Sequence, residues 1–239
     1  MCKTNLLRSR VVAMSTVAAA LLACFTTSSA QVVVYENLGT SALGGTSRLN
    51  SENPIFGDAL NLTQSGQLSL VGLSLFNSSS GGNTGAILTG TMVVNFYDNT
   101  TAYAGGSLSA GRALLGSATV NWDFSADGGL LAGFYATDTF DLTANNINLT
   151  SKIFVTQKFT LTSGTSTRNG VILFDNPTTG TSTSTVYLYS SAVAEGLYTF
   201  TGNPGQFGYH LEVTLVPEPA TLALAGLGAF ALLALRRRK

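Results

Sequence analysis

Apolar and polar residues alternate one by one over many short stretches of this chain. In residues 91–98, for example, Met92, Val94 and Phe96 fall on one face while polar residues fill the other. A period of two predicts a β-strand with one buried face. The same analysis predicts strands at residues 32–35, 60–62, 68–76, 91–98, 114–124, 137–142, 152–162, 171–174, 185–189 and 207–215. Clusters of Gly, Asn, Asp and Ser separate these stretches, so we expect an all-β fold, a single antiparallel β-sandwich of jelly-roll-like type.

Two of the predicted strands have more specific patterns. Residues 68–76 are apolar on both faces, which indicates either a central strand or a bulge at Gly72. The last stretch, 207–215, places Tyr209, Leu211, Val213 and Leu215 inward and His210, Glu212 and Thr214 outward. No helix longer than a turn or two is expected between residues 31 and 215.

The first 30 residues have the pattern of a secretory signal peptide. Basic residues at Lys3, Arg8 and Arg10 precede an apolar stretch, 11–25, that is expected to be helical. Small residues then lead to a cleavage position for signal peptidase between Ala30 and Gln31. A second interpretation stays open, because residues 21–24 (LLAC) resemble a lipoprotein box that would make Cys24 a lipidated N-terminus.

The last 24 residues, 216–239, form a second address label. Pro217, Glu218 and Pro219 interrupt regular structure, because proline lacks an amide donor and restricts the residue before it. Residues 220–235 are uncharged and apolar, and as a helix they would extend roughly 24 Å. Their Leu and Phe residues supply only about −3.5 kcal/mol for membrane insertion, so we expect a short transmembrane helix that anchors the chain transiently. A basic cluster follows on the cytoplasmic side, at Arg236, Arg237, Arg238 and Lys239.

This arrangement of proline-Glu-proline, short helix and basic cluster resembles the PEP-CTERM sorting signal of exopolysaccharide-producing Gram-negative bacteria. The same region is also described as a C-terminal domain of ice-binding proteins. The resemblance implies that Pro217, Glu218 and Pro219 are recognised by a membrane-embedded exosortase. It further implies an inner-membrane intermediate, followed by transfer to the outer cell surface or the extracellular matrix.

The region between the two labels has a weaker resemblance. Residues 34–38 (VYENL), 57–62 (GDALNL), 73–76 (LSLF) and 94–98 (VNFYD) are similar to the jelly-roll-like "choice-of-anchor" domains of bacterial surface proteins. Those families have no assigned catalytic residues, so the resemblance implies a fold and a location but no chemistry.

Residues 31–215 are enough for one domain, and their composition limits the classes of partner that this domain can bind. This region carries 5 Lys and Arg against 11 Asp and Glu, a net charge of −6, which argues against nucleic acid as a partner. Both cysteines, Cys2 and Cys24, lie in the signal region, so no disulfide and no thiolate metal site is expected in the domain.

Candidate chemistry in the domain is sparse. His210, the only histidine, could act as a base with Glu212, although a solvated histidine on the polar face of an edge strand is the simpler interpretation. Asp138 and Asp141 could form a glycosidase pair. A calcium site could use oxygen ligands that recur at every second residue, Asn121, Asp123, Ser125 and Asp127. None of these sets has a complete motif, so we expect neither a cofactor nor a metal. If a metal does bind, calcium is the candidate.

Two further patterns could bind a ligand. A sugar-stacking platform could use the aromatic residues Trp122, Tyr97, Tyr103, Tyr135, Tyr187, Tyr189 and Tyr198, although aromatics in sandwiches more often pack in the core. Residues 178–185 (TTGTSTST) could order water as ice-binding surfaces do, but a single row makes no flat array.

The sequence therefore predicts an exported, non-enzymatic structural protein of the cell surface or biofilm matrix. The alternatives are an exopolysaccharide-binding module and, with less support, a polysaccharide-active enzyme or an ice-binding protein.

Overall fold

The structure is a computed structural model that describes residues 30–40, 42–46, 55–100, 112–190, 193–199 and 205–215. For residues 42–46, 183–190 and 193–199 it describes only the main chain. Residues Gln31–Leu215 belong to one compact unit. The predicted signal-peptide helix and the predicted transmembrane helix at 220–235 lie outside the described residues. Within the described part of the chain, no helix is long and apolar enough to cross a membrane.

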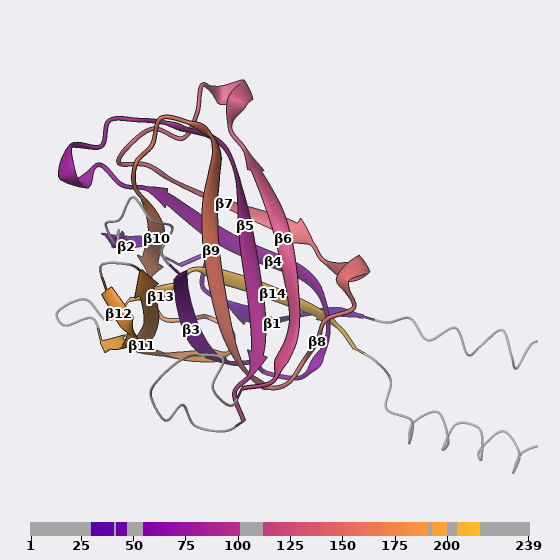
Figure 1. Cartoon of the computed structure of the whole chain (residues 1–239). Helices are drawn as coiled ribbons and strands as arrows, with labels where there is room; N and C mark the ends of the chain where they lie inside the picture. The colour runs from indigo at the N-terminus through magenta and orange to yellow at the C-terminus, as the bar shows by residue number, and fades with distance from the viewer. Residues whose placement is uncertain are drawn as a thin grey trace, which may run out of the picture. The chain divides into compact units, whose positions relative to one another are not determined.

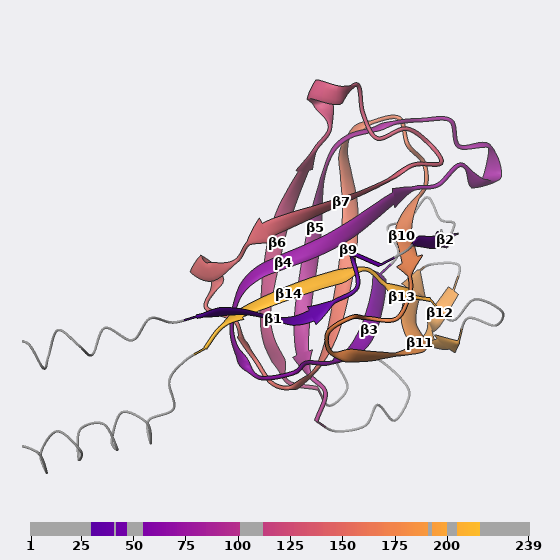
Figure 2. The same cartoon turned by 180° about the vertical axis from the view of Figure 1, so that it is seen from behind.

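The described strands form two antiparallel sheets that face each other (Figures 1 and 2). The first sheet follows the order β1 (Gln31–Glu36), β14 (Tyr209–Thr214), β4 (Gly66–Asn77), β10 (Asn169–Phe174) and β13 (Gln206–Phe207). Three further strands join it: β2 (Ala42–Thr46) pairs with β10, and β7 (Tyr135–Asp141) and β8 (Asn148–Leu149) pair with β4.

The second sheet contains the longest continuous pairings. Its order is β12 (Val193–Thr199), β11 (Thr181–Ser190), β3 (Ile55–Asn61), β9 (Lys152–Gly164), β5 (Ile87–Asp98) and β6 (Leu114–Asp123). Helical structure in the described residues is limited to three short 3₁₀ turns, Ser80–Gly82, Ser125–Asp127 and Thr143–Asn145. The prediction of an all-β sandwich is confirmed.

One hydrophobic core fills the space between the sheets. The first sheet contributes residues such as Leu73 and Leu211, and the second contributes residues such as Val94 and Ile153, all with no exposed surface. The alternation read from the sequence is the cause, since every second residue of β5 and β14 points to this interior. Burial of this apolar surface is the main force that holds the two sheets together.

Strand β4 is central, as one of the two interpretations of its apolar pattern predicted. It pairs with β14 along one side and with β7 along the other. The predicted bulge at Gly72 is wrong, because Gly72 pairs in register with both His210 and Thr139. The register of β4 instead shifts between the pairs formed by Leu70 and Leu68, which leaves Ser69 as the extra residue.

The structure differs from the predicted elements at several other places. The stretch 207–215 is divided at Gly208, because β13 pairs with β10 whereas β14 pairs with β1 and β4. A Cβ atom at Gly208 would lie 2.4 Å from the Phe174 ring, so a larger residue would not fit at the division. Strand β3 begins at Ile55 rather than residue 60, and β2 occupies part of a segment predicted as a Gly-rich and Ser-rich loop.

Candidate functional site

The candidate site lies on the outer face of the first sheet, where the first and last strands of the domain pair. The antiparallel register sets Glu36 of β1 opposite His210 of β14. Because inward residues of β14 alternate with outward ones, His210 and Glu212 both point out of the core. The predicted outward orientation of these two residues is confirmed. The predicted edge position is wrong, because β14 lies between β1 and β4.

Both ring nitrogens of His210 are hydrogen-bonded to carboxylates. Nδ1 donates to Oε2 of Glu36, and Nε2 donates to Oε1 of Glu212 at 3.0 Å. The side chains are largely covered, with 17% of His210, 22% of Glu36 and 24% of Glu212 exposed. The second oxygen of Glu36 accepts the Gly39 amide at 3.0 Å, which fixes the carboxylate from the other side.

These contacts favour the protonated form of His210. Burial lowers its pKa, but the hydrogen bonds and charges of Glu36 and Glu212 outweigh burial, so the pKa lies above its ordinary value of 6.5. The positive charge of the imidazolium also offsets part of the repulsion between the two carboxylates. The cluster therefore acts as a polar clasp between β1 and β14, which we call the terminal clasp (Glu36, His210 and Glu212).

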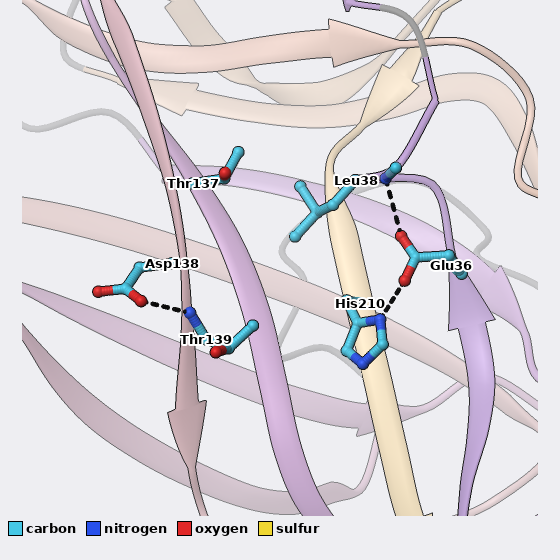
Figure 3. A pocket seen from close by; sticks show the side chains of 7 residues that line it. Glu36, Leu38, Thr137, Asp138, Thr139 and His210 are labelled. Atoms are coloured by element: carbon cyan, nitrogen blue, oxygen red, sulfur yellow. Dashed lines mark hydrogen bonds and ion pairs between the residues drawn. The ribbon is translucent and has the colours of Figure 1, made fainter.

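A shallow hollow of about 340 Å³ lies beside the terminal clasp (Figure 3). Gly72 lies between His210 and Thr139 in the row across the sheet, and the side chains of His210 and Leu38 pack over it. A Cβ atom at Gly72 would approach the Cβ of His210 and the Cδ1 of Leu38 to 2.7 Å each. Thr137 and Thr139 border the hollow from β7, opposite Glu36 and Leu38.

The arrangement can bind, but it is poorly suited to general-base catalysis. A base needs a nitrogen that can accept a proton from a substrate, and each nitrogen of His210 already donates to a carboxylate. The hollow offers threonine hydroxyls, one apolar side chain and a carboxylate edge, which suits a polar, hydroxyl-bearing ligand.

The two aspartates considered as a glycosidase pair do not face each other. Asp138 and Asp141 are three residues apart on β7, so their side chains project from opposite faces of that strand. The Asp138 carboxylate accepts the Thr139 amide at 2.7 Å and points away from His210 (Figure 3). Asp141 instead accepts the Thr143 amide at 2.9 Å at the end of the strand.

The candidate calcium ligands are arranged as a strand end and turn. Asp123 accepts hydrogen bonds from the amide and hydroxyl of Ser125, and these bonds lower the pKa of its carboxyl. Asn121 and Asp127 are exposed on either side of this turn. Among the described residues, no group of three or more His, Cys, Asp and Glu side chains is arranged to hold a metal ion.

Of the aromatic residues considered as a sugar platform, the three whose side chains are described, Trp122, Tyr97 and Tyr135, do not gather on one surface. Trp122 is buried against Phe124 and Phe140, with ring centroids 5.7 and 5.3 Å away. Tyr97 covers Phe154 on the outer face of the second sheet. Tyr135 is exposed and meets Phe174 edge to face. Tyr103 and the side chains of Tyr187, Tyr189 and Tyr198 lie outside the described part.

The threonine-rich tract at 178–185 is attached to the sandwich at several points. The amide and hydroxyl of Thr178 both donate to the main-chain oxygen of Glu36. The hydroxyl of Ser182 points instead to buried Asp58, at 3.0 Å. The described hydroxyls of this tract therefore bond to different parts of the protein and do not form one row that could order water.

The predicted processing sites are only partly described. Ala30 and Gln31 are exposed at the start of β1. Pro217, Glu218 and Pro219, the basic cluster from Arg236 to Lys239, and Cys24 lie outside the described residues.

Two acidic residues with specific surroundings were not among the predicted site residues. Glu36 stood out in the sequence only as part of the family-like segment 34–38, although pairing of the first and last strands brings it to His210. Asp58 was read only as part of a family-like segment, yet it is fully buried between the sheets. Its position between inward-facing Phe56 and Leu60 was the available signal.

Comparison with known proteins found one match, and it lies at the C-terminus. Residues 215–239 match the family model described as the PEP-CTERM protein-sorting motif. No curated protein and no solved structure gave a significant match. The motif implies export, processing by exosortase, and placement at the cell surface or outside the cell. The chain therefore carries a PEP-CTERM protein-sorting motif, the signal for exosortase-dependent sorting, at residues 215–239.

Proposed function

We propose that the sandwich is a non-catalytic structural component of the cell surface or biofilm matrix, delivered there by the C-terminal sorting motif. The observation that carries this proposal is the terminal clasp. The only histidine of the chain has both ring nitrogens bound to carboxylates, and so it ties two strands together instead of presenting a base. The two candidate catalytic aspartates also face away from each other across β7.

The surface of the domain is consistent with this role. Residues 31–215 carry few charges for their length, and their polar positions are mostly Ser, Thr, Asn and Gly. Uncharged hydroxyl and amide groups can form many weak hydrogen bonds with a hydrated polymer without needing a defined pocket. A protein of this kind would work through its abundance and placement.

Binding of exopolysaccharide is the second candidate, and the hollow beside the terminal clasp favours it. Two threonine hydroxyls and the edge of Glu36 border a space of about 340 Å³, which can accommodate a sugar unit. A polysaccharide-active enzyme and an ice-binding protein have no comparable feature in their favour.

A glycan array probed with the full chain separates the two candidates. The structural proposal expects no selective binding, with or without a chelator. Selective binding that is lost in Thr139→Val, but retained in the matched variant Thr119→Val on the second sheet, would favour the carbohydrate-binding module. Binding that disappears with chelator would additionally bring calcium back as a cofactor.

A second experiment tests the structural role itself. A strain that lacks the protein should form a matrix of lower cohesion, and the wild-type chain and His210→Gln should both restore it. Release of reducing sugar from the matrix polysaccharide by the purified protein, abolished by Asp138→Asn or Asp141→Asn, would overturn the proposal in favour of an enzyme.

A further inference from the structure

A cluster of polar side chains is buried inside the sandwich, between the two sheets. Asp58 comes from β3 and Ser182 from β11, both in the second sheet. Tyr35 comes from β1 and Gln206 from β13, both in the first sheet. Tyr35 and Asp58 have no exposed surface, and Gln206 is 4% exposed. Ser182 is partly buried, and the four residues meet where the sheets face each other.

The contacts within this cluster join a hydroxyl, an acid and an amide. The Ser182 hydroxyl donates to Oδ2 of Asp58 at 3.0 Å. The Tyr35 hydroxyl donates to the side-chain oxygen of Gln206 at 3.3 Å. The side-chain nitrogen of Gln206 lies 3.4 Å from the main-chain oxygen of Ser182 and 3.3 Å from Oδ1 of Asn176. The amide of Gln206 is thus held directly beside Ser182.

The surroundings of Asp58 and Tyr35 raise the pKa of both groups. Burial is the main reason that the pKa of Asp58 lies well above its ordinary value, so its ionised form is a stronger base than an exposed aspartate. Burial and the neighbouring Asp58 also raise the pKa of Tyr35, against a hydrogen bond from Ser182, so the phenol keeps its proton and can donate it in a hydrogen bond. The distance between Ser182 and Asp58 is within the range required of a general base.

We propose that Ser182 and Gln206 form an intramolecular ester that links the two sheets covalently. The Ser182 Oγ attacks the side-chain carbonyl carbon of Gln206, and the carbon–nitrogen bond of the amide breaks. The proton of the hydroxyl passes to Asp58 and then to the departing nitrogen, which leaves as ammonia. Tyr35 donates to the carbonyl oxygen while it carries negative charge.

The reaction needs no oxidant, metal or external nucleophile. Holding the hydroxyl and the amide in one cluster replaces a bimolecular encounter, and well-oriented intramolecular reactions reach effective concentrations of about 10⁵–10⁸ M. Residues 31–215 contain no cysteine, so the domain has no disulfide. The ester would supply a covalent link between its two sheets instead. This inference does not depend on the proposed function.

Peptide mapping of the folded full chain, purified from an exporting host, tests the ester directly. Trypsin and a glutamate-specific protease cut after Arg168, Glu195 and Glu212, so Ser182 and Gln206 fall in separate peptides, 169–195 and 196–212. The ester predicts one joined species whose mass is the sum of the two peptides less one ammonia. Hydroxylamine should separate it, and the linear peptides should be minor species.

Variants distinguish the proposed residues from their neighbours. Ser182→Ala should restore both linear peptides with Gln206 unmodified. The matched variant Thr181→Ala removes the adjacent hydroxyl, which bonds Asn61 at an exposed position, and should keep the joined species. Asp58→Asn should also abolish the link, and a circular dichroism spectrum shows whether that variant is folded.

The wild-type digest alone can overturn the proposal. Linear peptides 169–195 and 196–212 from folded protein, with an intact Gln206 amide, would contradict it. So would an ammonia loss that maps only to the peptide containing Gln31, because an N-terminal glutamine can cyclise by itself. Persistence of the joined species in Ser182→Ala would show that the link uses another nucleophile.

Discussion

At the scale of single residues, the terminal clasp makes a pH-dependent contribution to stability. The pKa of His210 is raised in the folded protein, so its contribution is fully present below the unfolded value of 6.5 and is lost as pH rises through the folded pKa. We predict that His210→Gln lowers the free energy of unfolding by roughly 1.5–3 kcal/mol near pH ~6, because it removes the hydrogen-bonded charge of the terminal clasp. Urea denaturation measures this difference.

The pH profile separates the clasp from a general effect of substitution. The difference between wild type and His210→Gln should shrink at alkaline pH. Asp138→Asn borders the same hollow but bonds only its own neighbour, so its pH profile should match that of wild type. A His210→Gln difference that stays constant from acidic to alkaline pH would show that the imidazolium does not stabilise the fold.

Gly72 provides a second prediction at this scale. An alanine there would bring its Cβ within 2.7 Å of His210 and Leu38, so one of these side chains must move. We predict that Gly72→Ala costs about 1–3 kcal/mol of stability, measured by thermal or urea unfolding. Gly39→Ala is the matched control on the rim of the hollow, because its nearest contact would be 3.9 Å away. Equal effects of the two variants would be inconsistent with close packing at Gly72.

Individual residues also show what the sequence could and could not predict. The inward positions Met92, Val94 and Phe96 are buried as predicted, because alternation depends only on neighbours along the chain. The contact between Glu36 and His210 joins residues at opposite ends of the domain. It depends on which strands pair and in what register, and no local pattern specifies that pairing.

At the scale of elements, one asparagine side chain forms hydrogen bonds with several of the segments that connect the strands. Asn77, at the end of β4, is fully buried, and its amide group donates to the main-chain oxygens of Gly85 and Leu130 at 2.9 and 2.7 Å. Its side-chain oxygen accepts from Asn83 at 3.0 Å and from Ser166 at 2.7 Å. Three segments that are distant in sequence therefore depend on this one side chain.

We predict that Asn77→Ala lowers the free energy of unfolding by about 2–4 kcal/mol, because it leaves several buried polar groups without partners. Urea denaturation is the measurement. Asn121→Ala, at an exposed position on β6, is the matched control and should change stability by no more than about 0.5 kcal/mol. A small effect of Asn77→Ala would mean that water can replace Asn77 as the hydrogen-bond partner of these buried groups.

The sequence predicted the strands that bury one face, because burial of one face produces alternation. It did not predict strands without such alternation. Strands β5 and β9 show clear alternation and were found close to their observed positions. Strand β2 consists of residues ALGGT, whose composition indicates a loop, and it is a strand because its main chain pairs with β10. The division at Gly208 was missed because it reflects a change of pairing partners rather than a change of composition.

At the scale of the whole molecule, the first strand of the domain, β1, begins beside the point where the last strand, β14, ends. Gln31 pairs with Thr214, so the predicted site of signal-peptide cleavage and the start of the sorting motif adjoin the same rim of the sandwich. Only three peptide steps separate Thr214 from Pro217, a reach of at most about 10 Å. We therefore predict that exosortase cleaves close to the folded domain and that β14 stays complete in the processed protein.

The mass of the mature C-terminus is the most direct test of the sorting account. In a host with an active exosortase, the wild-type chain should end near Pro217–Pro219 and lack Arg236–Lys239. Glu218→Ala should keep the whole segment, whereas Thr221→Ala, a matched change just after Pro217–Pro219, should be processed like the wild type. A Glu218→Ala protein with an unchanged, fully processed C-terminus, or a wild-type protein that retains Lys239, would contradict the assignment of this motif as the sorting signal.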